Sequence, residues 1–292
     1  MIKILITGGT GLIGRHLTEK LLEKNYEVII LTRNPKNKNE FKWDIDKGYI
    51  DENVFKNLDY TIHLAGAGIA DKRWTDKRKE EIIHSRVAST NLLFEKIKEH
   101  KVNLKGFIAS SAIGFYGAKT TDKIFTETDK PANDFLGKVC QLWEEAIHQF
   151  KKENSRTVIL RTGVVLTKNG GALAKMKTPI ISPIGSGKQY IPWIHIDDLC
   201  NLYIASIENN LSGIYNAVSP EHQTSKSFSK ILAKKLKRLY VPIGVPSFLL
   251  KLIFGEMAVI LLKGSRVSSK KIEEASFKFE FRTLTKALES LL

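Results

Sequence analysis

Cysteine is scarce in this chain, and long apolar runs are absent. The 292 residues include only Cys140 and Cys200, which form no C-x-x-C pair and argue against a disulfide framework. The longest apolar stretch, 248–262, is interrupted by a lysine, a glycine and a glutamate, so it is too short and too polar to cross a bilayer. An apolar strand pattern begins at residue 2, which leaves no room for a signal peptide before it. We therefore expect a cytoplasmic protein with no membrane segment.

Acidic residues are too few to balance the basic ones. The chain carries 46 Lys and Arg against 31 Asp and Glu, a net charge of +15. The basic residues are spread along the chain rather than gathered in one block, which disfavours nucleic acid as a partner. A phosphorylated cofactor or an anionic small-molecule substrate accounts for local positive charge more simply. No His, Asp or Glu cluster has ligand spacing, so we expect no metal site.

Residues 1–33 predict one βαβ unit. A first apolar run, the sequence TGGTGLIG at 7–14, an amphipathic helical pattern and a second apolar run follow one another. Gly8 permits the tight turn after the strand, and Gly11 lets a pyrophosphate approach the backbone. Gly14 allows the helix to pack on the strand. The free N–H groups at the start of that helix favour phosphate binding.

The end of the second strand predicts which dinucleotide is bound. An acidic residue there would accept hydrogen bonds from a ribose 2′-hydroxyl and favour NAD. This chain has Thr32 and Arg33 instead, and a guanidinium can pair with a 2′-phosphate. We therefore expect NADP(H), the alternative being that Arg33 is an ordinary surface arginine.

Strands alternate with helices as far as residue 166, which predicts an α/β fold with a Rossmann-type, doubly wound parallel sheet. Later strands are expected at 41–46, 59–64, 107–111, 157–161 and 212–217, with a helix at 76–100. Small residues after the fourth strand, including Gly66, would let a cofactor lie across the sheet edge.

The pattern changes after residue 166, where glycine, proline and helical stretches predominate. We expect a nucleotide-binding domain at 1–166, to which 196–220 returns. A smaller, mostly helical substrate lobe is expected at 167–195 and 221–292. Apolar residues of its last part are expected to be helix core rather than a partner groove: Leu249, Leu250, Ile253, Val259, Leu261 and Leu262.

The chain resembles the extended short-chain dehydrogenase/reductase superfamily. The motifs TGGTGLIG, LAG, FIASSA and WIHIDDL carry this resemblance, and HLAGAGIADKRW, IGFYG and GSGKQYIPWIHIDDL are similar to YfcH-like epimerase-family proteins. The resemblance implies a Rossmann domain, NADP(H) and a C-terminal substrate lobe, but no particular reaction. The cofactor-binding positions that it implies are Thr10, Gly11, Leu12, Ile13, Thr32, Arg33, Leu64, Ala65, Glu81, Arg86 and Val165.

The superfamily's catalytic Tyr-x-x-x-Lys pair is missing. Ser111 matches the serine that orients the substrate oxygen, but the helix expected from 134 has apolar residues or a thiol at the paired positions. Without the pair, the phenol of lowered pKa that exchanges the proton is lost. Ordinary dehydrogenase or epimerase chemistry therefore needs another proton donor.

Three hypotheses follow from this loss. In the first, the protein is an oxidoreductase or nucleotide-sugar-epimerase-like enzyme whose proton donor has moved to Tyr116, His195 or Cys140. The structural alternatives for these three residues are a packing tyrosine with a satisfied hydroxyl, a histidine bonded to a neighbouring aspartate, and a small buried thiol.

In the second hypothesis, the chain is a non-catalytic NADPH-binding redox sensor or regulator. In the third, which is the least favoured, it binds nucleic acid. The substrate is an unidentified small molecule, and the fold is compatible with a homodimer.

Overall fold

The computed structural model describes residues 1–153 and 155–292. Its largest sheet contains β1 Lys3–Thr7, β2 Glu27–Thr32, β3 Glu40–Asp44, β4 Tyr49–Ile50, β5 Tyr60–His63, β6 Gly106–Ala112, β8 Thr157–Thr162 and β12 Gly213–Ala217. The strand order is β12-β8-β6-β5-β1-β2-β3-β4. Every neighbouring pair is parallel except β3 with β4. The predicted α/β class with a doubly wound parallel sheet is confirmed.

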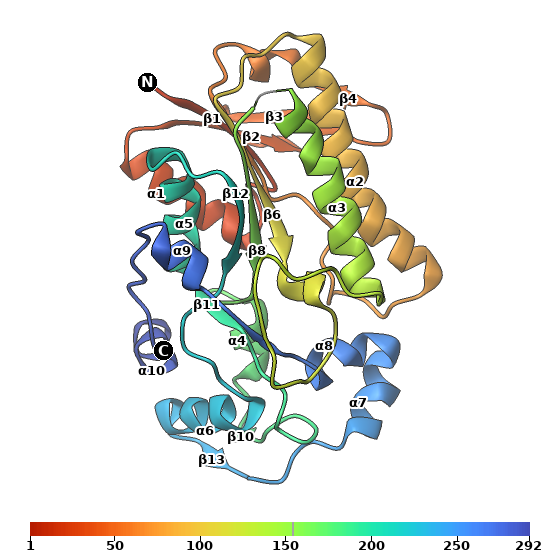
Figure 1. Ribbon diagram of the computed structural model, residues 1–292, viewed down its shortest axis with the longest axis vertical. Coiled ribbons are helices and arrows are strands. Elements are labelled where there is room, and N and C mark those ends of the chain that lie inside the picture. Colours follow the sequence, from red (N-terminus) through yellow and green to blue (C-terminus); the bar gives the residue numbers. More distant parts are fainter. Residues whose placement is uncertain (154) are drawn as a thin grey trace.

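Helices cover both faces of this sheet. Figure 1 shows α1 (Leu12–Glu23) and α5 (Ile196–Glu208) on one face, and α2 (Asp76–Glu99) and α3 (Phe135–Lys152) on the other. Alternate residues of one strand enter the two cores, because strand side chains point to opposite faces. In β1, Ile4 and Ile6 pack with α1 and α5, while Leu5 packs with α2 and α3. Burial on both faces explains why these strands read as continuous apolar runs.

The ends of α2 show how local chemistry sets a helix boundary. The Thr75 side chain accepts a hydrogen bond from the N–H of Arg78, which caps the first turn. Lys96 and Lys98 occupy the last turn, where positive charge is favourable beside the helix dipole. The predicted 76–100 helix is thus observed, with His100 as its C-terminal cap.

Besides β4, six short strands of the described residues had no clear counterpart in the sequence pattern. They form three two-stranded pairs: β7 (Ile124–Phe125) with β14 (Arg266–Val267), β9 (Val164–Leu166) with β11 (Trp193–His195), and β10 (Ile180–Ile181) with β13 (Leu239–Tyr240). Strands of two or three residues are too short to show a repeat, and each partner lies far away in the chain. Only the tertiary fold brings them together.

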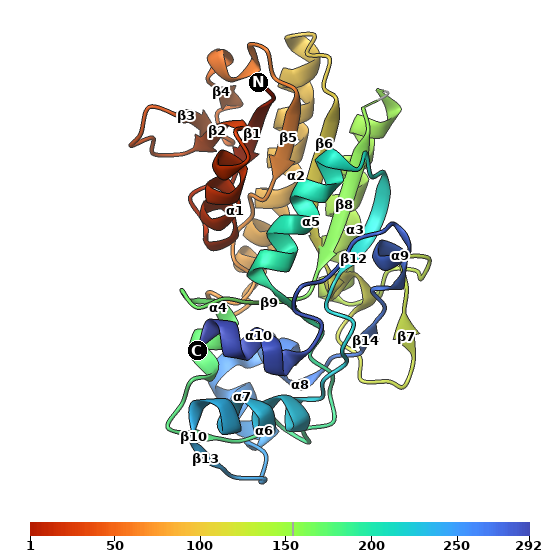
Figure 2. The same ribbon diagram turned by 90° about the vertical axis from the view of Figure 1, so that its left-hand side faces the viewer.

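The remaining elements gather mainly beyond the carboxyl ends of the central strands (Figure 2). They are α4 (Gly171–Met176), α6 (Ser225–Leu236), α7 (Ser247–Phe254), α8 (Val259–Leu262), α9 (Lys270–Glu274) and α10 (Leu284–Leu291), with short 3₁₀ helices at Ile113–Tyr116 and Gly255–Ala258. A further 3₁₀ helix, Glu52–Phe55, directly precedes β5 near the amino ends of the strands. The region around α9 differs, because Ile272, Phe277 and Phe279 join the core beneath α5. Among the described helices, none has both the length and the apolar composition that a membrane span needs.

We predict that Gly14→Ala destabilises the fold by about 1–3 kcal/mol, the usual cost of an overpacked core. A Cβ at this position would lie 2.3 Å from the carbonyl oxygen of Gly8 and 2.5 Å from the Cα of Gly9, and neither backbone atom can easily move. Urea unfolding measures the change. Gly114→Ala is the control, since its Cβ would meet Leu136 at an ordinary 3.4 Å. Equal stability of the two variants would contradict the prediction.

Candidate functional site

The glycine turn between β1 and α1 lies at the edge where the parallel strands end. Gly8 has a φ of +70°, and a Cβ there would come within 3.0 Å of the backbone of Leu64 and Ala65. The turn after β1 and the segment after β5 are therefore in direct contact. Gly11 caps α1 without a side chain, so the first N–H groups of the helix have no capping side-chain acceptor. This is the arrangement that a phosphate group prefers.

The expected cofactor-binding residues in the segments that follow β1, β2 and β5 all lie at this same edge of the sheet. The turn and the start of α1 contain Gly8, Thr10, Gly11, Leu12 and Ile13. Thr32 is the last residue of β2, and Arg33 is the next residue in the chain. The segment directly after β5 contains Leu64, Ala65 and Gly66. Val165 lies in β9, and the segment after β9 reaches the turn, because a Cβ on Gly171 would lie 3.2 Å from Leu12. The topology thus brings four separate segments to one place, at the switch point between β1 and β5.

Arg33 is the exposed basic residue that directly follows β2. Its side chain is exposed, and it makes no hydrogen bond or ion pair with any residue that the structure describes. An arginine at this position is free to pair with a phosphate, and its planar donors suit that group geometrically.

Two arginines of α2 hold the loop that follows β5. Arg86 donates to the carbonyl oxygen of Ala67 at 3.0 Å, and Arg78 donates to that of Gly68 at 2.6 Å. Glu81 is exposed and pairs with Arg78 at 2.7 Å, which lowers the pKa of the Glu81 carboxyl. Arg86 also lies 5.0 Å from the ring of Trp143, a cation–π contact. Glu81 and Arg86, which the resemblance had marked, therefore shape the loop beside the expected cofactor position.

His63 fixes the strand ends from inside. It is fully buried, its Nδ1 lies 2.7 Å from the hydroxyl of Thr7, and its Nε2 faces the hydroxyls of Ser89 and Thr90. The Thr7 hydroxyl in turn accepts the N–H of Ala65. Burial and the nearby Arg86 charge lower the pKa of His63 to about 3, so the ring is neutral at pH 7. The glycine turn is thereby tied to β5 and α2.

A buried ionic network surrounds Ser111. Its hydroxyl donates to Glu144 Oε1 at 2.7 Å, and the same carboxylate receives two bonds from Arg161, at 2.9 and 2.8 Å. Such a bidentate pair satisfies both charges, which would otherwise be costly to bury. The Ser111 proton is therefore directed toward Glu144, and the residue as a whole is buried, with 3% of its surface exposed.

Tyr116 belongs to the same network but is enclosed by protein. Its hydroxyl donates to Asn216 Oδ1 at 2.6 Å and accepts from Arg161 at 3.1 Å, and the side chain is buried. Burial raises the pKa of Tyr116 to about 12. A phenol that has both partners within the protein and so high a pKa is a poor proton donor to a substrate. The placement favours the packing role over the catalytic one.

The contacts of His195 are with residues other than Ser111 and Tyr116. At the end of β11 its Nδ1 accepts the N–H of Asp197, which caps α5, and its Nε2 lies 3.0 Å from the hydroxyl of Ser290. The ring stacks on Phe281 with centroids 3.7 Å apart. Burial lowers the pKa of His195 to about 4. This placement favours the structural role that the sequence had offered as the alternative.

The α3 positions that would hold the Tyr-x-x-x-Lys pair carry apolar residues or a thiol, as the sequence indicated. Asp134 caps that helix by accepting the N–H of Gly137, and Cys140 follows on its buried side. The thiol of Cys140 faces the carbonyl oxygen of Ala112 at 3.5 Å. Burial raises the pKa of Cys140 to about 12, so this group stays a neutral thiol.

Glu144, Arg161 and His63 are the site residues that sequence reasoning missed. Glu144 interrupts the apolar face of α3, and Arg161 follows an apolar strand run, so both are charged residues at buried positions. Buried charged residues are rarely left unpaired, so the sequence could have predicted that Glu144 and Arg161 form an ion pair with each other. His63 is likewise a buried polar residue, at the end of β5.

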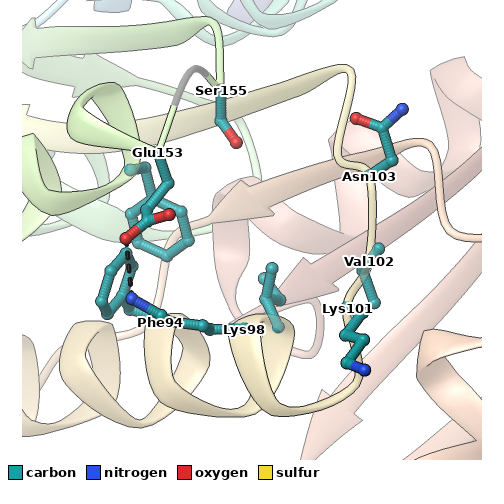
Figure 3. A pocket seen from close by; sticks show the side chains of 9 residues that line it. Phe94, Lys98, Lys101, Val102, Asn103, Glu153 and Ser155 are labelled. Carbon is teal, nitrogen blue, oxygen red and sulfur yellow. Dashed lines mark hydrogen bonds and ion pairs between the residues drawn. The ribbon is translucent and has the colours of Figure 1, made fainter.

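Two hollows on the surface lie away from the glycine turn. The one in Figure 3, of about 260 Å³, is lined by Phe94, Lys98 and Lys101 near the starts of β6 and β8, at the opposite end of the strands. The other, of about 500 Å³, lies between the 120–122 loop and the segment with Lys188 and Tyr190. The second hollow is lined in part by residues of the segments 167–195 and 221–292.

The sheet order, the glycine turn at its switch point and the open helix start define a Rossmann-type nucleotide-binding protein. The family model of the NAD-dependent epimerase/dehydratase family matches residues 4–217, and the chain belongs to that family. A model for a domain of unknown function, DUF1731, matches residues 245–291. The resemblance to the short-chain dehydrogenase/reductase superfamily and its epimerase-family proteins is confirmed.

Individual relatives are similar over the whole chain. Epimerase family protein YfhF of Bacillus subtilis is 35% identical over 303 residues, which cover 100% of this chain and 98% of the relative. The crystal structure of human epimerase family protein SDR39U1 (isoform 2) with NADPH has a TM-score of 0.90 and 29% identity over 99% of both chains. A nucleoside-diphosphate sugar epimerase from Corynebacterium glutamicum has a TM-score of 0.80 and 30% identity over 98% of this chain and 57% of its own.

We predict that the fold loses stability as the pH falls from about 6.5 toward 3, in part through His63. The unfolded histidine binds a proton below its ordinary pKa of 6.5, whereas the folded one stays neutral down to about 3. Stability is therefore present above pH 6.5 and is lost on acidification, by about 2 kcal/mol between pH 7 and 5. Urea unfolding of His63→Asn should show a shallower pH slope, and His84→Asn, an exposed control, should not. An unchanged slope in His63→Asn would contradict the assignment.

Proposed function

We propose that the chain binds NADP(H) and acts as an atypical short-chain dehydrogenase/reductase on a small-molecule substrate. The observation that carries this proposal is the unneutralised guanidinium of Arg33 at the carboxyl end of β2, beside an uncapped helix start. Support also comes from the solved relative SDR39U1, which was crystallised with NADPH. Other structures similar to this chain were solved with NAD. The preference for NADP(H) over NAD(H) is therefore part of our proposal and rests on Arg33.

The residues present fit such a cofactor. Gly8 and Gly11 leave the backbone bare where a pyrophosphate would approach, and Arg33 would hold the 2′-phosphate. Leu64, Ala65 and Gly66 would line the bound dinucleotide, on a loop that Arg86 holds in place. When bound, NADPH supplies a hydride to an electrophilic carbon.

The protein's own part in the reaction centres on Ser111. Glu144 and Arg161 orient its hydroxyl, so Ser111 would accept a hydrogen bond from the hydroxyl of an alcohol substrate, or from the hydroxyl that forms when a carbonyl is reduced, and so position the reacting carbon. This matches an oxidoreductase or a nucleotide-sugar-epimerase-like reaction. The membership of the epimerase/dehydratase family supports that reaction class.

We expect NADPH to bind more tightly than NADH, and Arg33→Ala to abolish the preference. Loss of a charge-assisted pair with the 2′-phosphate should weaken NADPH binding at least about tenfold, with little effect on NADH. A titration followed by nicotinamide fluorescence measures both constants. Lys130→Ala, which removes another exposed cation, is the matched control. If neither nucleotide binds, the proposal fails.

A second candidate is an NADPH-binding sensor or regulator without turnover. The observation that favours it is the state of the expected donors, because Tyr116 and His195 are buried and satisfied and Cys140 is a neutral thiol. Under this reading the cofactor binds, but no substrate is reduced.

NADPH oxidation over a panel of carbonyl substrates separates the two candidates. If the protein is an enzyme, we expect turnover that falls about tenfold in Ser111→Ala, which removes one hydrogen bond to substrate. Tyr116→Phe should leave turnover close to wild type while lowering stability by about 1–2 kcal/mol, because Asn216 loses its partner. Tight NADPH binding with no oxidation of any substrate would favour the sensor, and collapse of turnover in Tyr116→Phe would restore Tyr116 as the donor.

A further inference from the structure

Helix α7 exposes an apolar face that the fold leaves uncovered. Phe248 is 68% exposed, Leu252 is 73% exposed and Ile253 is 60% exposed, and Leu249 and the preceding Ile243 are exposed as well. The sequence-based expectation that Leu249 and Ile253 are core residues is therefore wrong. Large aliphatic and aromatic side chains clustered in this way mark an interaction surface.

The opposite side of α7 holds the helix in place. Leu250 is buried, and Phe254 packs with a cluster that contains Trp74 and Met257. The 3₁₀ helix that follows is attached to α2 through the ion pair of Lys79 with Glu256 at 2.6 Å. The exposed face is thus presented on a folded helix, and covering it requires no unfolding.

Positive charge is concentrated in the same part of the chain. Segments 167–195 and 221–292 together contain 18 Lys and Arg but only 6 Asp and Glu, so they carry +12 of the chain's +15. Lys251 is exposed on α7 itself, and Lys226 and Lys230 are exposed on α6. Figures 1 and 2 show α6, α7 and the β10–β13 pair at one end of the molecule. The basic residues are spread along the whole sequence, but the acidic residues are few in these segments. Most of the net positive charge therefore belongs to the segments that form this end.

We propose that α7 docks on a lipid bilayer that contains anionic headgroups. Its apolar side chains would enter the boundary between headgroups and acyl chains, while the surrounding lysines would contact the negative surface. A helix that carries both features lies in the plane of the bilayer interface and does not span it.

A second copy of the chain is a poorer occupant of this face. A helix of eight residues is about 12 Å long, and a stable interface needs roughly 800 Å² from each partner. Docking two such ends would also bring together two surfaces with the same strong positive charge, which is unfavourable. Nucleic acid would satisfy the charge but leave the aliphatic side chains exposed. An anionic bilayer satisfies both.

Vesicle co-sedimentation of the full chain tests the proposal. We expect binding to phosphatidylglycerol/phosphatidylcholine vesicles, no binding to phosphatidylcholine alone, and release at high salt, since screening weakens the charge attraction. The double variant Leu252→Ser/Ile253→Ser should weaken partitioning at least about tenfold, because two apolar side chains no longer enter the bilayer. Lys251→Glu should also weaken it.

Leu22→Ser is the matched control, because Leu22 is a half-exposed leucine on α1 outside the basic segments. It should bind vesicles as the wild type does, and circular dichroism should show all variants folded. Absence of vesicle binding by the wild type overturns the proposal, as does binding that Leu252→Ser/Ile253→Ser leaves unchanged. A concentration-dependent dimer in sedimentation velocity, lost in that double variant and unaccompanied by vesicle binding, would assign the face to a second copy instead.

Discussion

The close approach of α1 to the end of β1 is the constraint on which the rest of the structure depends. With no side chain at Gly14, the helix can sit against the backbone of Gly8 and Gly9, at distances that no Cβ tolerates. That contact aims the uncapped start of α1 at the switch point between β1 and β5. Hydrogen bonds secure the same point, because the Thr7 hydroxyl contacts the ring of His63 and also accepts the N–H of Ala65. Core packing and the geometry of the proposed cofactor site therefore depend on the same contact.

The chemistry of the site is governed by buried charge rather than by a tyrosine and a lysine. Glu144 and Arg161 neutralise each other beneath Ser111, which makes their burial tolerable and gives the serine a fixed orientation. Arg161 also donates a hydrogen bond to the hydroxyl of Tyr116. This arrangement orients Ser111 but gives the Tyr116 hydroxyl two partners inside the protein, which is why turnover and cofactor binding without turnover are both proposed.

The C-terminal part adds a second physical theme, the separation of charge. The sheet-forming segments are almost balanced, whereas the segments around α6 and α7 are strongly basic and carry an exposed apolar helix. The same region packs against Trp74 and α2, close to the loop that follows β5. A surface that binds an anionic bilayer would therefore be joined by packed side chains to the proposed nucleotide site.

The sequence by itself determined the parallel sheet, the glycine turn and the arginine after β2, because these depend on short-range periodicity and on residues within one βαβ unit. Their side-chain requirements are visible in a window of about 30 residues. The roles of Tyr116 and His195 were decided only by tertiary structure. The partner of Tyr116 is Asn216, 100 residues away, and that of His195 is Ser290, 95 residues away. A titratable side chain takes its pKa from burial and from such distant neighbours, and neither is written in the local sequence.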